Sequence, residues 1–421
     1  MINIKVLNFR TITVILYGLF LLSIIYPTIH KPGLMLSIIV FCLYFIVMFF
    51  WERSIIYDSK SVIINLFFGF WIIWTLLSMF WAINQDVITT YLIYNIFYFT
   101  IAFIFSQEST LKNFFDYIRF FFTLVIILYL AISIWEMLTW NHLPNSRFVK
   151  MQVFTFKPTA VFSNENDNAS ILMLYFPIGL FYLKRSKNII VKFVSIAMMF
   201  LSLFIIILNG ARLAILTIFL ILPLYWLFFT GKLTKILTII FLILALLIVS
   251  FYWTDHYYLA KDYIEFQFST LSTETQNVLS SSIEVRIELM NKSFDALIKT
   301  WGFGVGSGNF DFFMNPVKSI KTGGIIKNHN LFLEILSNNG IILAVTFIYL
   351  IVSSGIFYLK MVFKKSELGL HYLLMILFFI ASSIIPSSIM GYHIFWIMLI
   401  YALFGYREVH IEKTKDACPT N

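Results

Sequence analysis

Arg212 is the first of three side chains in this sequence whose types and positions could handle charged groups. It follows Asn209, Gly210 and Ala211 at the expected mouth of an apolar helix. A guanidinium gives planar, bidentate bonds to phosphate and never loses its charge. The N-terminal end of a helix also favours an anion. Arg212 is therefore a candidate anion-binding residue; the alternative is an arginine that snorkels to lipid headgroups.

Arg286 lies in a second candidate segment. Residues 283–299 have the hydrophobic spacing of an amphipathic helix, with one apolar face formed by Ile287, Met290, Phe294, Leu297 and Ile298. Alone, this segment is typical of a helix lying on the membrane surface with a solvated Arg286. Together, Arg286 and Arg212 could bind the two phosphates of a diphosphate.

His329 stands just before a long apolar run. Its imidazole titrates near neutral pH and could accept a proton from a hydroxyl as a general base. The alternative is a histidine that only marks the membrane boundary. Glu334 and Asn338 follow within the apolar run itself. Ionisable groups are costly there, so these two side chains should make contacts in the protein interior.

Two further polar segments have weaker signals. Residues 162–168 include Asn166 and Asp167 and could cap a helix or bind sugar hydroxyls; Glu165 and Asp167 alone are too few ligands to predict a metal site. Residues 301–310 contain four alternating glycines. They lack the strand and helix that flank a nucleotide-binding glycine loop. We expect a tight turn that brings the backbone close to another element.

Membrane-spanning helices must position these residues. The chain has 421 residues, of which 60% are hydrophobic and 12% charged, too apolar a balance for a soluble core. In lipid, isolated spans must be helical because their backbone groups need internal partners. We therefore predict an all-α integral membrane protein with about twelve transmembrane helices of roughly 20 residues: 11–29, 33–51, 62–82, 87–106, 117–140, 168–184, 189–208, 212–230, 233–253, 331–359, 369–387 and 389–406.

The basic residues orient these helices. With the N-terminus inside, eighteen Lys and Arg fall on inner segments and five on the shorter outer loops, which favours both termini in the cytoplasm. Four regions follow: helices one to nine in 1–253, a large outer loop in 254–330 with short helices, helices ten to twelve in 331–406, and a cytoplasmic tail in 407–421. The two cysteines, Cys42 and Cys418, predict neither a disulfide nor a metal site.

These motifs, in this order, resemble the O-antigen ligase and polysaccharide polymerase family. The resemblance rests on four stretches: residues 162–168, residues 209–213, Arg286 with the glycine turn 304–310, and the His329-Asn330 run that ends at Gly340. Trp81-Ala82 is a looser match. Where the family commonly has Ser before the first arginine, this chain has Ala211, which puts in doubt a hydroxyl role there but not the role of Arg212.

The resemblance implies a glycosyltransferase of the bacterial cytoplasmic membrane. It would move a glycan from undecaprenyl diphosphate to a sugar hydroxyl of a glycan or lipid-linked acceptor at the outer face. Arg212 and Arg286 would bind the diphosphate and stabilise the leaving group, and His329 would be the base. One displacement would invert the anomeric carbon. Asn166, Asp167, Asn330 and Glu334 would bind substrate.

No metal or other cofactor is expected. The first outer loop, His30-Lys31-Pro32-Gly33, lacks the carboxylates that many membrane glycosyltransferases use to hold a metal. The partners expected are the lipid-linked donor, the acceptor and membrane lipids, and a chain-length regulator is left open. Nucleic acid is not expected, because the net charge of +9 is spread along short loops.

Three alternatives stay open. The family resemblance does not separate a repeat-unit polymerase, which we favour, from a ligase that uses a lipid core or other terminal acceptor. A transporter or flippase for lipid-linked sugars would need polar groups along a path near the midplane, which most spans lack. A purely structural membrane component would not require Arg212, Arg286 and His329 to converge.

Overall fold

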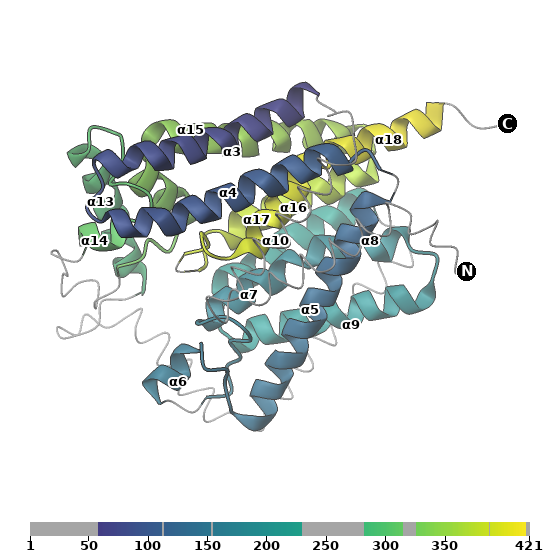
Figure 1. Ribbon diagram of the computed structural model, residues 1–421. Coiled ribbons are helices and arrows are strands. Elements are labelled where there is room, and N and C mark those ends of the chain that lie inside the picture. Colours follow the sequence, from purple (N-terminus) through teal and green to yellow (C-terminus); the bar gives the residue numbers. More distant parts are fainter. Residues whose placement is uncertain are drawn as a thin grey trace, which may run out of the picture.

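The computed structural model describes residues 58–111, 113–152, 155–229, 282–314, 326–386 and 388–417. Within these ranges every regular element is a helix (Figure 1). The expected spans 11–29, 33–51 and 233–253 lie outside the described residues, as do both cysteines and residues 254–281 of the expected outer loop. The all-helical prediction is confirmed for the described part of the chain.

Six of the described helical segments are long and apolar enough to cross a membrane. The first is α3 (Ser59–Leu77), continued by the 3-10 turn η2 (Ser78–Phe80). The others are α4 (Gln85–Glu108), α5 (Phe114–Thr139), α9 (Ile189–Leu208), α15 (Leu331–Phe363) and α17 (His393–Phe404) continued into α18 (Tyr406–Ala417). These segments make the chain an integral membrane protein.

The sixth expected span is divided into two helices. Residues 168–184 were predicted as one helix, but the structure has α7 (Glu165–Leu174) and α8 (Phe176–Arg185). Pro177 lies in the first turn of α8, where its missing N–H is tolerated, whereas it could not continue the hydrogen bonds of a single helix. The following α10 (Arg212–Phe229) and α16 (Glu367–Ser382) are shorter apolar helices.

The C-terminal boundaries also differ from those expected. The span predicted at 389–406 begins at His393, and the tail predicted at 407–421 is helical through Ala417 as α18. Gly405 separates α17 from α18, and a Cβ there would collide with the Tyr372 ring of α16. A close approach between these helices therefore explains the junction.

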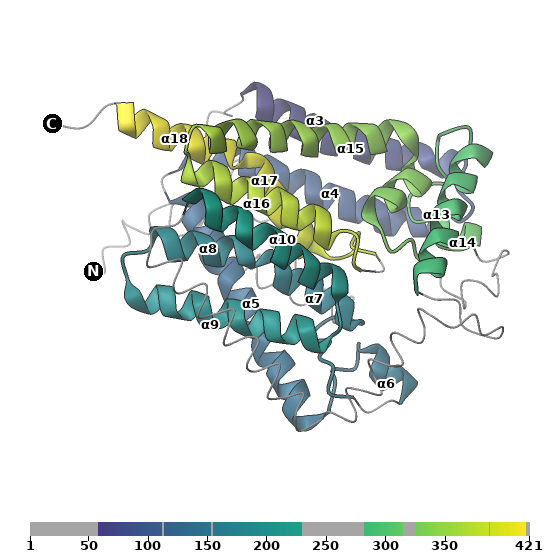
Figure 2. The ribbon, with the colours of Figure 1, turned by 180° about the vertical axis from the view of Figure 1, so that it is seen from behind.

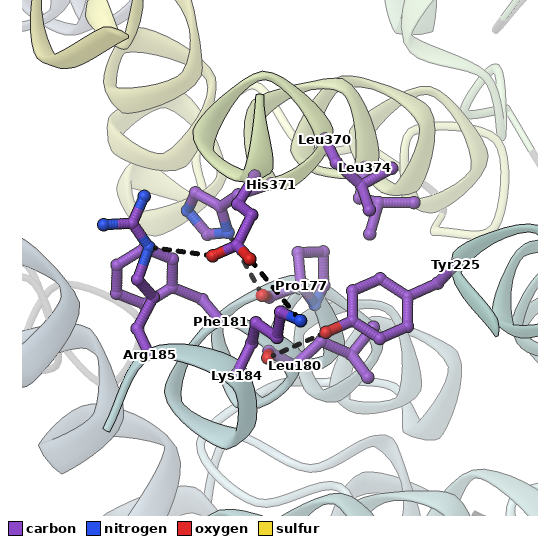
Figure 3. A pocket seen from close by; sticks show the side chains of 10 residues that line it. Pro177, Leu180, Phe181, Lys184, Arg185, Tyr225, Leu370, His371 and Leu374 are labelled. Atoms are coloured by element: carbon purple, nitrogen blue, oxygen red, sulfur yellow. Dashed lines mark hydrogen bonds and ion pairs between the residues drawn. The ribbon is translucent and has the colours of Figure 1, made fainter. Parts of the chain in front are cut away.

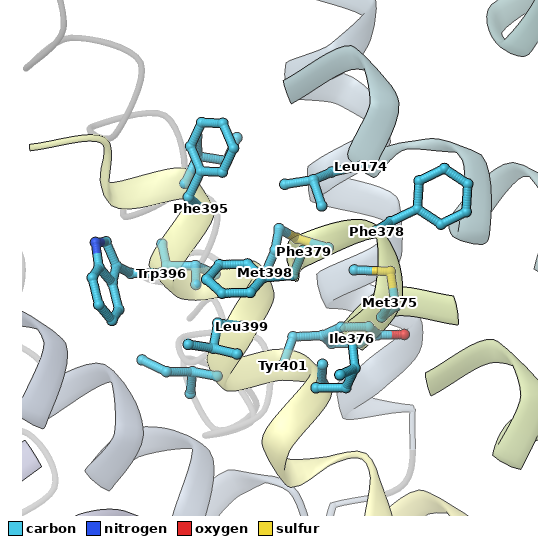
Figure 4. Close-up of a cluster of buried hydrophobic side chains, with 14 of the residues drawn as sticks. Leu174, Met375, Ile376, Phe378, Phe379, Phe395, Trp396, Met398, Leu399 and Tyr401 are labelled. Atoms are coloured by element: carbon cyan, nitrogen blue, oxygen red, sulfur yellow. The ribbon is translucent and has the colours of Figure 1, made fainter. Parts of the chain in front are cut away.

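Helix α17 is the centre of the bundle. Each of its twelve residues is buried, and it packs against α4 and α16. Figure 4 shows this core, where Met375 and Phe379 of α16 meet Met398 and Tyr401 of α17, with Leu174 of α7 nearby. A helix that is apolar all round can lie in a protein core or in lipid, and the burial of every α17 residue places this one in the core.

The candidate residues gather toward one end of the bundle. Helices α13 (Ser282–Lys299) and α14 (Phe310–Met314) lie beside the start of α15 in both views (Figures 1 and 2). Helix α10 starts at this same end, which we call the α13 end, and α18 lies at the opposite end. The short α6 (Arg147–Met151) precedes α7 on the side of the α13 end.

Candidate functional site at the α13 end

The predicted amphipathic helix is present as α13. Its inward face packs on the segment that follows it, through a small core of Val285, Leu289, Ala296, Val305, Phe310 and Met314. The face predicted to be apolar points away from this core, with Ile287, Met290, Phe294 and Ile298 exposed. Arg286 is half-buried between the two faces. The helix thus has one face packed on the protein and one available to lipid.

Asn328 joins α13 to α15. Its side-chain oxygen accepts a hydrogen bond from Ser293 Oγ at 2.7 Å, and its Nδ2 donates to Ser337 Oγ at 2.7 Å. Asn328 and Ser293 are buried, so breaking either bond would leave a polar group without water. This bridge fixes the short segment that carries His329, the next residue.

The glycine turn packs on a kink in α15. Gly340 interrupts that helix with φ 84°. Val305 and Gly306 donate backbone hydrogen bonds to the carbonyls of Ser337 and Asn338, at 2.8 and 2.9 Å. A Cβ on Gly304 would lie 2.5 Å from the Gly340 nitrogen. The expected close backbone approach is therefore confirmed, and only glycine fits at this contact.

The other side of the turn binds the α3–α4 junction. Trp81 Nε1 donates to the Gly304 carbonyl at 2.9 Å, and the Asn84 backbone N–H donates to Asn309 Oδ1 at 2.6 Å. Trp81, noted as a loose match to the family pattern, thus holds the glycine turn. The glycine turn therefore connects the α3–α4 junction with α13 and α15, which lie more than 200 residues later in the sequence.

His329 lies in the electrostatic field of two cations. Burial, together with the charges of Arg286 and Lys327, lowers the pKa of His329 to about 4. The imidazole is therefore neutral at pH 7, as a proton acceptor must be. Its backbone has φ 50°, an uncommon conformation for a residue with a side chain that often occurs at functional sites.

Arg286 and Lys327 give this region its positive charge. Burial lowers the pKa of Arg286, although a guanidinium stays charged in proteins. Asp311 of α14 is also nearby, and burial raises the pKa of its carboxyl, with Lys327 opposing the shift. The structure thus brings together Arg286, Lys327 and His329, which we call the α13–α15 cluster. Lys327, two residues before His329, had not been selected from the sequence.

Two predicted substrate-binding residues on α15 have local structural partners. Asn330 caps α15, and its Oδ1 accepts hydrogen bonds from Phe332 N and Leu333 N at 2.9 and 3.3 Å. Glu334 is buried, and its Oε1 accepts from Ser388 Oγ at 2.7 Å. Its second oxygen has no partner among the described residues. The expected interior contact of Glu334 is therefore present, and so is that of Asn338 through Phe310 N.

The polar segment before α7 is largely internal. Asn164 caps α7, as one interpretation predicted, by accepting from Asn166 N at 2.9 Å. Asp167 is buried and accepts from Tyr392 Oη at 2.6 Å. Asn166 is half-buried. Asp167 thus joins α7 to the start of α17.

Arg212 is the exposed first residue of α10. Asn209, three residues earlier, is buried and donates from Nδ2 to the carbonyls of Pro158 and Glu165, at 3.1 and 3.0 Å. The charges that act on His329 are those of Arg286 and Lys327. The structure therefore brings Arg286 and His329 together and places Arg212 on another helix at the same end of the bundle.

The described residues contain no group of three or more His, Cys, Asp or Glu side chains that could hold a metal.

A small pocket lies near the opposite end, between the end of α8 and the start of α16, where Lys184 and Arg185 pair with Glu367 (Figure 3). Its volume is about 20 Å³, room for a water molecule but not for a sugar. The α13–α15 cluster is the better candidate site.

Long apolar helices and a polar, cationic end define a multi-pass membrane protein. Residues 197–348, from α9 into α15, match the family model described as O-Antigen ligase. This segment contains Arg212, Arg286, His329 and Glu334. The resemblance to the O-antigen ligase and polysaccharide polymerase family is therefore confirmed.

A curated relative extends this similarity beyond the matched segment. The chain is 26% identical over 350 residues to the Teichuronic acid biosynthesis protein TuaE of Bacillus subtilis (strain 168), covering 80% of this chain and 70% of that protein. The description of the family model and the name of this relative both refer to the assembly of surface polysaccharides.

Proposed function

We propose that this protein transfers a glycan from undecaprenyl diphosphate to a sugar hydroxyl at the outer face of the bacterial cytoplasmic membrane. The observation that carries this proposal is the α13–α15 cluster, in which a neutral imidazole lies in the field of Arg286 and Lys327. A diphosphate needs cations, and an attacking hydroxyl needs a base. The α13–α15 cluster supports the proposal because it offers two cations and a neutral imidazole within the segment that matches the family model.

The two cations would act on the leaving group. Negative charge grows on the diphosphate as the glycosidic C–O bond breaks, and cations held in place before the reaction stabilise that charge. We assign this role to Arg286 and Lys327, with Arg212 as a further cation from the start of α10. Asn166, Asp167, Asn330 and Glu334 would support substrate binding, mainly by fixing the helix starts around the site.

His329 would become a stronger base when the donor binds. In the free protein, burial and the charges of Arg286 and Lys327 hold its pKa near 4. A bound diphosphate would oppose those two charges and raise the pKa toward the usual value of His. The base would therefore reach its working strength only in the complex with the donor. A single displacement, inverting at the anomeric carbon and without a metal, completes the proposed reaction.

The topology is part of the proposal. Twelve spans with both termini in the cytoplasm would put the α13 end, and the loop 254–330, on the outer face. The excess of Lys and Arg on the opposite segments supports this orientation. Helix α18 would then lie at the cytoplasmic surface.

The test is a product-length gel. Purified protein in lipid receives undecaprenyl-diphosphate-linked repeat units of its own pathway, with a chelator present. We expect a ladder, because we favour a polymerase, and we expect His329→Ala to abolish it. The matched control is His410→Ala, since His410 is an exposed histidine on α18 at the other end of the molecule.

Each other outcome has a defined meaning. A single addition that requires a terminal acceptor would identify a ligase instead of a polymerase. A ladder that needs a divalent metal would contradict the metal-independent reaction. No transfer to either acceptor, from folded protein and the correct donor, would overturn the enzyme proposal and favour transport of lipid-linked sugars.

A further inference from the structure

Glu136 is a fully buried carboxylate near the end of α5 that the proposed reaction does not use. Its Oε2 accepts two backbone hydrogen bonds, from Thr159 N and Ala160 N, both at 2.7 Å. Its Oε1 accepts from Thr159 Oγ1 at 3.1 Å. The carboxylate therefore holds a short loop, residues 155–160, against α5.

His142 completes this arrangement. Its Nδ1 lies 3.1 Å from Glu136 Oε1, and its Nε2 lies 3.0 Å from the Thr155 carbonyl oxygen. A carbonyl can only accept, so Nε2 must carry a proton. A neutral imidazole then has none left for Nδ1. The unprotonated Nδ1 and the carboxylate Oε1 would then both be acceptors facing each other. One further proton must therefore lie between Glu136 and His142, on either the ring or the carboxyl.

The loop held by this pair reaches the turn before Arg212. The Pro158 carbonyl accepts from Asn168 Nδ2 of α7 and from Asn209 Nδ2, each at 3.1 Å. Asn209 is buried and ends α9, two residues before Ala211 and three before Arg212. The loop backbone is thus a common support for the ends of three helices. If it moves, the turn that aims Arg212 loses a buried hydrogen bond.

We propose that Glu136 and His142 form a one-proton latch that holds the 155–160 loop and so positions Arg212; this inference rests on the proposed role of Arg212. Neither residue is proposed to touch the substrate. Loss of the shared proton to solvent leaves a carboxylate facing an imidazole lone pair in a buried site. Such an uncompensated contact is costly, so the latch opens at alkaline pH and Arg212 loses its fixed position.

The described groups that face the pair come from the loop and from α6. Thr155 and Thr159 face it from the loop, and the Phe148 ring of α6 lies 5.1 Å from the imidazole, centroid to centroid. Arg147, next to Phe148, is bonded to Glu165 instead. Lys157 lies on the same loop, and within the described residues the ionisable partner of Glu136 is His142, at 3.1 Å.

The test compares two substitutions at one position. In Glu136→Gln the amide oxygen can accept from Thr159 N and Ala160 N, while the amide NH₂ donates to neutral His142 Nδ1. This variant keeps the latch but needs no titrating proton. We expect transfer at neutral pH within about twofold of the native protein, with the activity loss at alkaline pH abolished. Glu136→Ala cannot bridge the groups, and we expect a loss of roughly 10²-fold at all pH values.

A readout independent of catalysis separates this inference from the proposed function. Amide hydrogen exchange becomes faster with pH even in an unprotected peptide. In the native protein, exchange of the Thr159 and Ala160 amides should increase at alkaline pH by more than this intrinsic amount. In Glu136→Gln it should increase only by the intrinsic amount. If the protein proves not to be a transferase but this exchange pattern holds, the latch stands and only its link to Arg212 fails. If Glu136→Gln loses protection as Glu136→Ala does, or keeps the alkaline loss, the shared proton is refuted.

Discussion

At the scale of single residues, the site depends on the charge state of His329 and on cations that change it. The imidazole is neutral in the free protein because it is partly buried beside Arg286 and Lys327. Its basicity is therefore not a fixed property but depends on what the cations bind. Two predictions follow from this coupling.

The pH dependence of transfer should differ between kcat/KM and kcat. The first reports the free enzyme, in which the pKa of His329 is about 4, so kcat/KM should fall only as the pH drops through that region. The second reports the donor complex, in which the bound diphosphate raises the pKa of His329, so kcat should fall at a higher pH. Steady-state kinetics across the acid range would measure both. An acid limb of kcat at or below that of kcat/KM would contradict the proposed base.

Removal of the Arg286 charge should slow the transfer itself. Arg286→Ala takes away a cation placed for the developing leaving-group charge, and such losses reduce kcat by roughly 10²-fold to 10³-fold. The same change should raise the pKa of His329, because one opposing charge is gone. Lys292→Ala is the matched control on α13, since Lys292 pairs with Glu288 and Asp295 on that helix. Equal kinetic losses in the two variants would argue against a specific role for Arg286.

At the scale of elements, the glycine turn and the kink of α15 form one joint. Gly304 and Gly340 both have positive φ and approach each other closely. Trp81 and Asn84 bind the other side of the turn. The joint is therefore the contact through which α3 and α4 support the start of α15, where His329 and Asn330 lie.

Gly340→Ala should destabilise the protein by about 1–3 kcal/mol, because φ 84° is strained for alanine and the added Cβ meets Phe303 at 2.5 Å. Gly355→Ala is the control on the same helix, since a Cβ there meets nothing within 4 Å. It should be neutral or stabilising by up to about 1 kcal/mol. Thermal unfolding in detergent would compare the two. An unchanged midpoint for Gly340→Ala would show that the kink is not required for stability.

The sequence predicted the position of helix α13 in the chain, but it did not predict which face of that helix packs on the protein. The spacing of apolar residues predicted a helix at 283–299, and α13 covers 282–299, because periodicity is a local signal. It could not show that the predicted apolar face is exposed while Val285 and Leu289 pack inward. That choice depends on the glycine turn, which follows in the chain and folds back on α13.

The sequence predicted only some residues of the candidate site, because contacts between distant segments are not visible in a local pattern. Arg286 and His329 were selected by residue type and position, and the structure brings them together, but their catalytic roles remain proposals. Lys327 and the Glu136–His142 pair were missed. Their significance comes from burial and from partners on other segments, which the chain order does not reveal.

At the scale of the whole molecule, a buried ion pair joins α5 to α18 at the end of the bundle opposite the α13 end. Arg119 of α5 donates to both carboxylate oxygens of Glu408 on α18, at 2.8 and 2.9 Å, and to Tyr401 Oη of α17 at 2.9 Å. Arg119 is fully buried. The C-terminal helix α18 is therefore fixed to α5 and α17.

Breaking this pair from one side should destabilise the protein strongly. Glu408→Gln leaves the buried guanidinium without its main counter-charge, and we expect a loss of about 3–5 kcal/mol. The double variant Arg119→Met, Glu408→Gln should lose less than Glu408→Gln alone, because no buried charge is left unpaired; Asp116, which also pairs with Arg119, is largely exposed to solvent. Unfolding measurements on Arg119→Met, Glu408→Gln and the double variant, each compared with the native protein, form a double-mutant cycle. Simple additivity of the two changes would mean that Arg119 and Glu408 are not coupled.

The complete burial of α17 has a consequence for how the protein is made. This helix is near the end of the chain, yet it fills the centre of the bundle and contacts α4, which is synthesised about 300 residues earlier. The earlier helices cannot close around their own core before α17 arrives. Packing of the bundle core must therefore wait until α17 has been synthesised and inserted.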